Sequence, residues 1–166
     1  MTDASQPLIA ADQLEKLYQL RITNAPPEEE YARITRILCH ALGCRISAIS
    51  LAAGEIQWST SLRAESDADT QRKLLFCAQA SDSDAEIIVA DASMDPRFAA
   101  DPKVMENPKI RFFAAHPLFL APGVRMGFLC AIDSKPMLID GQKLQILRDL
   151  AKITEVMLAA RLREMG

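Results

Sequence analysis

The sequence is poor in aromatic residues and in histidine, and it has no excess of basic residues. Aromatics make up 5% of the 166 residues, and only His40 and His116 carry imidazole rings. Lysine and arginine number 19 against 22 acidic residues, which gives a formal net charge of -3. A histidine-based zinc site is therefore disfavoured, and no overall positive charge would attract nucleic acid or an anionic membrane.

The chain also lacks any long apolar run. None approaches the roughly 20 residues of a membrane-spanning helix. The first residues, MTDASQPLIAADQ, do not show the basic and then apolar order of a signal peptide. We therefore expect a cytoplasmic protein with no nucleic-acid partner and no membrane partner.

Cysteine is present, but not in a C-x-x-C pair or in a second cluster that would complete a metal site. The favoured interpretation of the cysteines is that they are buried or half-buried thiols that act as small hydrophobes. They are Cys39, Cys44, Cys77 and Cys130. Cys39 and His40 are adjacent on a predicted helix, where successive residues point in different directions, so a Cys-His nucleophile has little support. We predict no catalytic residue and no metal ligand.

Half of the chain is apolar, which suffices for one domain with a real core. We expect a flexible N-terminus over residues 1–11 and a single domain over 12–166. Apolar residues at helical spacing predict four helices: 12–22, 27–42, 72–80 and a last one of about 25 residues that begins at Asp140. Five segments are typical of strands: 45–52, 55–62, 86–90, 110–119 and 124–133.

Regular alternation along the last two strands predicts which side chains share a face of the sheet. On the first of them, one face would carry Arg111, Phe113 and Ala115, and the other Ile110, Phe112, Ala114 and His116. On the second, one face would be fully apolar, with Val124, Met126, Phe128, Cys130 and Ile132. Its opposite face would carry Arg125, Gly127, Leu129 and Ala131.

This order of hairpins, with helices at both ends of the chain, favours an α+β fold with an antiparallel sheet over a doubly wound parallel one. The segment 91–107 between two of the strands is rich in proline and charge, and we expect a loop without regular structure there. Two hypotheses remain open for Arg97 and Arg111. They could bind a carboxylate or phosphate, or they could pair with Asp91, Asp95 or Asp101 and tie the loop to the sheet, which we favour.

Three motifs stand out in this half of the chain: DASMDPRFAADPKV (91–104), IRFFAAHPL (110–118) and GFLCAIDSKP (127–136). They resemble the signature of GAF domains, especially those of bacterial sensor kinases and cyclic-di-nucleotide signalling proteins. LFCAQA (75–80) is similar to another motif of that group, and the resemblance extends from about Leu14 to about Leu158. The sequence departs from the group at Gln79, Phe113, Ala115, His116 and Phe128.

The resemblance implies a central antiparallel sheet of five or six strands. The first two helices and the last one would cover one face, and the short helix around Phe76 with segment 91–107 the other. Family ligands sit between the sheet and that second cover. The candidate ligand-binding residues are therefore Phe76, Asp91, Asp95, Arg97, Phe98, Arg111 and Phe113, while the ligand or cofactor is unknown.

The function that follows is a stand-alone, non-enzymatic sensory or regulatory module. It would bind a small ligand, dimerise through its first and last helices and act on a signalling partner. Two alternatives stay open. One is a thiol redox enzyme or redox sensor that uses Cys77 or Cys130, and the other is a structural interaction module whose cavity is filled by its own side chains.

Overall fold

We describe the fold from a computed structural model, which covers residues 28–51, 55–61, 85–106 and 109–165. The expected flexible N-terminus and the predicted helices over 12–22 and 72–80 lie outside these residues. So do Phe76 and Cys77. Within the described ranges, no helix has the length and apolar content that crossing a membrane requires.

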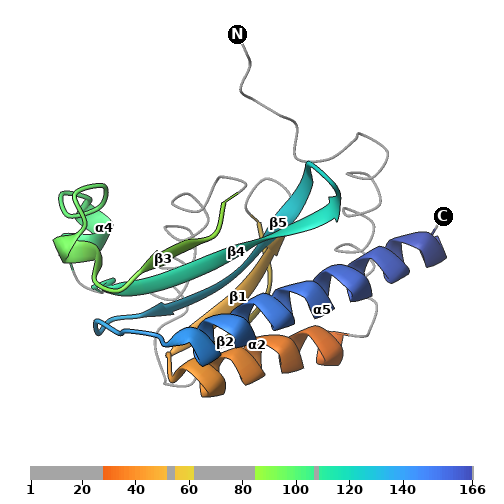
Figure 1. Cartoon of the computed structure of the whole chain (residues 1–166), viewed down its shortest axis with the longest axis horizontal. Helices are drawn as coiled ribbons and strands as arrows, with labels where there is room; N and C mark the ends of the chain where they lie inside the picture. Colours follow the sequence, from red (N-terminus) through yellow and green to blue (C-terminus); the bar gives the residue numbers. More distant parts are fainter. Residues whose placement is uncertain (1–27, 52–54, 62–84, 107–108, 166) are drawn as a thin grey trace, which may run out of the picture.

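One antiparallel sheet forms the centre of the described fold (Figure 1). Its five strands are β1 (Ile46–Leu51), β2 (Glu55–Ser61), β3 (Ile87–Val89), β4 (Phe112–Ala121) and β5 (Val124–Asp133). They lie in the order β2-β1-β5-β4-β3, and every neighbouring pair is antiparallel. The predicted α+β class and the two predicted hairpins are therefore confirmed.

Two long helices, α2 (Glu28–Leu42) and α5 (Gly141–Met165), lie side by side on one face of the sheet (Figure 1). Local signals set their ends. Gly43 ends α2 with a φ of 78°, which L-residues with a side chain rarely adopt. Asp140 caps α5, because its Oδ1 accepts a hydrogen bond from the Lys143 N–H at 2.9 Å.

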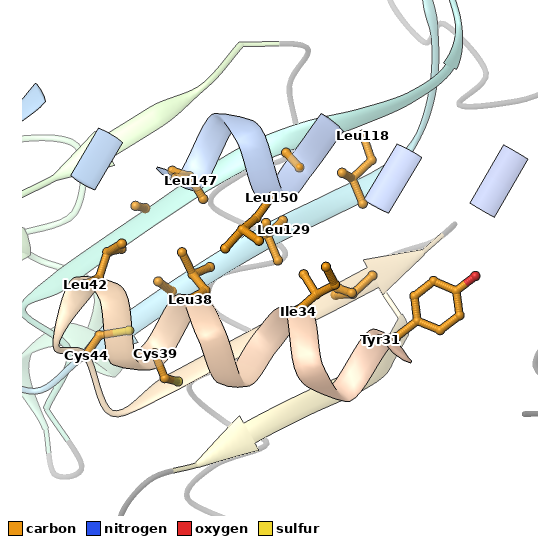
Figure 2. Packing of buried hydrophobic residues seen from close by; sticks show 14 of the residues in the cluster. Tyr31, Ile34, Leu38, Cys39, Leu42, Cys44, Leu118, Leu129, Leu147 and Leu150 are labelled. Carbon is orange, nitrogen blue, oxygen red and sulfur yellow. The ribbon is translucent and has the colours of Figure 1, made fainter. Parts of the chain in front are cut away.

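We call the sheet face under α2 and α5 the helix face. It buries a cluster that includes Leu38, Ile49, Leu129, Leu147 and Leu150, part of which is drawn in Figure 2. The other side, which we call the opposite face, buries a second cluster. Its strand residues are Ile46, Ala48, Val89, Phe113, Ala115, Cys130 and Ile132.

The segment 91–106 covers part of the opposite face and is more regular than expected. It contains a 3-10 turn, η1 (Ala92–Met94), and a one-turn helix, α4 (Pro102–Met105). The prediction of a loop without regular structure was therefore wrong. Proline is tolerated at the first helical position, because the N–H group there has no partner within the helix. Pro102 occupies this position of α4, so a segment rich in proline can still form a helical turn.

A β-bulge corrects the predicted faces of β5. Leu118 lies opposite Gly127, but Phe119 lies opposite Arg125, so Met126 is an extra residue with no cross-strand partner. Met126 joins the cluster on the helix face, whereas the Arg125 guanidinium lies 4.9 Å from the centre of the Phe128 ring. The predicted grouping of Met126 with Phe128, and of Arg125 with Leu129, was wrong because unbroken alternation does not hold through a bulge.

Ile110 is a smaller correction. It belongs to the cluster on the opposite face, together with Phe113, rather than on the face of Phe112. The reason is that β4 begins only at Phe112, so the alternation of a strand does not extend back to Ile110.

Candidate functional site

Two of the three aspartates of the 91–106 segment, Asp91 and Asp95, hold that segment together. Asp91 Oδ1 accepts hydrogen bonds from the Ser93 N–H at 3.0 Å and the Ser93 hydroxyl at 2.6 Å, which caps η1. Asp95 accepts two bonds from the Arg97 guanidinium, at 3.0 and 2.7 Å. This hydrogen bonding from Arg97 holds the pKa of Asp95 below its ordinary value, and the same contact raises the pKa of Arg97. Arg97 thus pairs with an aspartate, as we favoured, but the pair lies within the segment and does not itself tie the segment to the sheet.

Arg111 ties the segment to the sheet through the main chain. Its Nη1 donates to the carbonyl oxygens of Val104 at 2.6 Å and Ile110 at 3.0 Å. Its own carbonyl oxygen accepts from the Ala92 N–H at 2.6 Å. The guanidinium therefore binds two main-chain carbonyl groups, of which that of Val104 lies in the segment, where the sequence had suggested an aspartate.

Beneath the segment, the two phenylalanines of the predicted site form an aromatic pair. The rings of Phe98 and Phe113 meet edge to face, with centroids 5.2 Å apart. Phe113 is fully buried, and Ala92 and Val104 pack into the same cluster. The protein's own side chains occupy this part of the opposite face.

Three of the predicted residues come together at an open groove of about 510 Å³. The groove is lined by residues 88–91, at the end of β3, and by residues 94–97. Asp91, Asp95 and Arg97 lie along it, whereas Phe98, Arg111 and Phe113 do not line it. The structure thus divides the described candidates between a surface groove and the core below the segment.

Three further residues stand out on the opposite face, and sequence reasoning missed them as a site. Ser50 lies directly across from Phe128 in the β1–β5 ladder, and Arg125 stacks on Phe128. All three are buried: the exposed fraction is 1% for Ser50, 5% for Phe128 and 7% for Arg125. Among the described residues, none forms a hydrogen bond with Ser50 Oγ. A buried hydroxyl without a partner is costly, so this group requires an explanation.

Cross-strand register places this trio away from the aromatic pair. Ile132 lies across from Phe113, and Phe128 stands four residues before Ile132 on the same strand. At about 3.4 Å per residue, the two positions are roughly 14 Å apart along the sheet. The only sequence signal for Ser50 was a hydroxyl in the apolar run ISAISL, and none indicated the bulge that brings Arg125 to Phe128.

On the helix face, Glu86 joins three elements. Its carboxylate accepts from Arg148 of α5 through two bonds of 2.9 Å, and Oε1 lies 2.9 Å from His116 Nδ1 of β4. Hydrogen bonding from Arg148 holds the pKa of Glu86 below its ordinary value and raises the pKa of Arg148. This contact fastens the start of β3 to both β4 and α5.

Cys130 is 2% exposed and lies in the cluster of the opposite face, while Cys39 and Cys44 are buried on the helix side. These three thiols are therefore buried, as expected. Within the described ranges, no three His, Cys, Asp or Glu side chains are grouped so as to hold a metal ion.

Comparison with known proteins agrees with this architecture. The family model of the GAF domain matches residues 26–158. A cyclic di-GMP phosphodiesterase of Pseudomonas aeruginosa is 34% identical over 118 residues, which cover 71% of this chain but only 20% of that protein. The chain therefore spans about a fifth of the length of that relative.

Solved structures show the same fold at low sequence identity. A domain of a two-component sensor histidine kinase protein from Sinorhizobium meliloti is 17% identical, with a TM-score of 0.63 and coverage of 84% of this chain and 94% of that one. The third GAF domain of Slr1393 from Synechocystis, in its photoproduct state, is 15% identical, with a TM-score of 0.64 and coverage of 80% and 93%. These structures share the fold, and the match of the family model over residues 26–158 shows that the chain belongs to the GAF family.

Proposed function

We propose that this domain is a non-enzymatic sensory or regulatory module that binds a small ligand on the opposite face of the sheet, beside the 91–106 segment. The ligand would place a carboxylate or phosphate near Ser50 and Arg125 and an apolar part against Phe128. Asp91, Asp95 and Arg97 belong to the segment that covers the neighbouring part of this face, and in this proposal they do not contact the ligand.

The observation that carries the proposal is the buried Ser50 hydroxyl, which has no hydrogen-bond partner among the described residues. Leaving such a group unsatisfied costs about 1–3 kcal/mol. A ligand that accepted a hydrogen bond from Ser50 would remove this cost.

Two further features support the same place. An arginine guanidinium suits a carboxylate or phosphate, and Arg125 is held close to Ser50 by its stacking on Phe128. Sheet irregularities flank the position on both sides. One is the bulge at Met126, and the other is the register shift of β2 opposite Ile49 and Ser50. Bulges are common where a sheet redirects side chains for function.

The test measures the melting temperature of the chain with cyclic di-GMP, cyclic GMP, ATP and citrate as separate probes. A bound probe at a hundred times its dissociation constant stabilises the fold by about 2.7 kcal/mol. We expect at least one probe to raise the melting temperature by several degrees. Ser50→Ala should abolish this shift while leaving the ligand-free protein as stable as wild type or more so, because the unsatisfied hydroxyl is gone.

Arg97→Met is the matched control, because Arg97 is exposed and belongs to the surface groove. It should retain the probe-dependent shift, and Arg125→Met should lose it. The proposal is contradicted if none of the four probes raises the melting temperature. It is also contradicted if Arg97→Met loses the shift while Ser50→Ala keeps it, because the ligand would then occupy the groove.

We also propose that the module acts as a homodimer through its helical layer, with α5 and the predicted helix over 12–22 at the interface, and that it passes its signal to a partner protein. Support comes from apolar side chains that α2 and α5 leave exposed. Ile153 and Val156 of α5 are 47% and 57% exposed, and Ile37 of α2 is 50% exposed. Residues three apart share a helix face, so Ile153 and Val156 form one apolar strip.

A structural interaction module is the second candidate, and the packing of Phe98 and Val104 against the sheet favours it. In that case the opposite face would need no ligand. The probe experiment separates the two functions, because a structural module would show no shift with any of the four compounds.

A further inference from the structure

Two thiols meet where α2 ends. The N–H groups of Gly43 and Cys44 both donate to the carbonyl oxygen of Cys39, at 2.8 and 3.1 Å. This pattern turns the chain back over the last turn of α2, which ends at Leu42. It brings the second residue after the helix into contact with a residue of that last turn. Here those two residues are Cys44 and Cys39.

The side chains of Cys39 and Cys44 are both buried at this turn. Cys39 and Cys44 are 0% and 1% exposed, and each thiol shifts the pKa of the other. The Cys44 thiol also donates to the Ile46 carbonyl oxygen at 3.5 Å. Figure 2 shows both sulfur atoms at the same end of α2. Both thiols therefore lie at the turn where the helix ends.

The two thiols differ in acidity. The hydrogen bond from Cys44 lowers the pKa of Cys39, whereas the same contact and burial raise the pKa of Cys44. Cys39 is consequently the thiol that ionises first, and thiolate is the nucleophilic form of cysteine.

We propose that Cys39 and Cys44 are a modification site, and that a hydroperoxide converts this pair into a reversible intramolecular disulfide that locks the end of α2. The proposal is independent of the ligand site described above, which uses neither cysteine.

Two displacement steps balance the reaction. In the first, Cys39 sulfur attacks one oxygen of hydrogen peroxide. The S–O bond forms, the O–O bond breaks, and the departing hydroxide takes up the thiol proton as water. In the second, Cys44 sulfur attacks the sulfenic acid of Cys39. The S–S bond forms, the S–O bond breaks, and a second water leaves with the Cys44 proton. Two thiols lose two electrons, and the peroxide gains them.

Access to the buried pair comes from its position at a helix end. Terminal turns open more readily than helix centres, because fewer contacts hold them. Gly43, between the two cysteines along the chain, is itself exposed. Opening of this turn admits a molecule as small as hydrogen peroxide without global unfolding.

The sequence provides a direct assay. Trypsin cleaves after Arg36 and Arg45, and the resulting peptide ILCHALGCR contains Cys39 and Cys44 but no other cysteine. The folded chain is treated with hydrogen peroxide, its remaining thiols are alkylated, and the digest is analysed by mass spectrometry. We expect this peptide to lose the mass of two hydrogen atoms and to regain two alkylatable thiols after dithiothreitol.

Two variants sharpen the result. Cys44→Ser should stop the reaction at the sulfenic acid of Cys39, which dimedone traps, and Cys130→Ser should form the disulfide as wild type does. The proposal fails if the peptide from folded, peroxide-treated wild-type protein carries two alkylated thiols. A crosslink from Cys39 to Cys77 or Cys130 in place of the intrapeptide disulfide would overturn it equally.

Discussion

Gly43 shows how much a single residue decides in this fold. Its φ of 78° turns the chain from α2 into β1 and brings Cys44 back against the last helical turn. A Cβ at this position would meet no atom within 4 Å, so a side chain has room there. The requirement for glycine comes from the backbone conformation alone.

Gly43→Ala should therefore destabilise the domain by about 1–2 kcal/mol, the usual cost of a left-handed conformation for a residue with a Cβ. Urea unfolding followed by circular dichroism measures the difference. Gly141→Ala is the matched control, because its Cβ would also meet no atom within 4 Å and no positive φ is involved. Equal stability changes in the two variants would contradict the backbone explanation.

At the residue scale, local chemistry was predictable from the sequence and non-local contact was not. Gly43 and Asp140 were identified as helix ends because the signals for helix ends lie within a few residues. The trio of Ser50, Arg125 and Phe128 was not identified, because it depends on the pairing of β1 with β5 and on a bulge. Neither the pairing nor the bulge can be predicted from the residues that are adjacent in the sequence.

Among the elements, β3 is the least supported by the ladder of the sheet. It has three residues and pairs with β4 at the end of the strand order found in the described part of the chain. Glu86, directly before it, adds bonds to Arg148 of α5 and His116 of β4. A longer strand would be held by more backbone hydrogen bonds. Here the side-chain contacts of Glu86 help to hold β3 in place.

Glu86 should make the stability of the domain depend on pH. Its pKa in the folded chain lies below the ordinary glutamate value, because Arg148 donates to the ionised carboxylate. The unfolded chain therefore binds the proton more tightly. The stabilising contribution is fully present above about pH 4.3, the ordinary glutamate pKa, and is lost as the pH falls through the folded value.

We expect Glu86→Gln to lower the melting temperature at pH 7 by roughly 2–4 °C, a typical response to a modest loss in a chain of this size. The difference from wild type should shrink as the pH falls below about 4, where the wild-type carboxylate is also protonated. Glu106→Gln, at an exposed position, serves as the control. A difference that stays constant from pH 7 to pH 3 would show that the charge of Glu86 is not its cause.

Element types were easier to predict than element boundaries or faces. The periodicity of α2 and α5 and the turn at Pro122 and Gly123 gave the helices and the main hairpin nearly as observed. The 91–106 segment was misjudged, since its prolines are compatible with short helical turns. Alternation also failed at Met126, because a bulge is fixed by the partner strand.

On the scale of the whole molecule, the helical layer is where two copies would meet. The 25 residues of α5 span about 37 Å, and the C-terminal part of the helix runs past the beginning of α2 (Figure 1). Ile153 and Val156 remain exposed on it. Burying such side chains in a second copy gains about 25 cal/mol for each Å² of apolar surface removed from water.

Joint replacement Ile153→Glu and Val156→Glu should convert the dimer to a monomer, because it would bring like charges together at the proposed interface. Light scattering coupled to size exclusion measures the mass in solution. Leu138→Glu is a suitable control, since Leu138 is 88% exposed and lies outside α5. The dimer proposal is wrong if wild type is monomeric at micromolar concentration, or if the double variant keeps the dimer mass.

The bulge in β5 also determines where the length of this chain can change. Gly127 pairs with Leu118 and Arg125 pairs with Phe119, so the partners of these two residues are already consecutive on β4. Removing Met126 would leave both pairs unchanged. Loss of that one codon would keep every other side chain of β5 on its present side, whereas a one-residue deletion within the regularly paired part would reverse all residues beyond it. Insertions and deletions among relatives should therefore accumulate at this point of the strand.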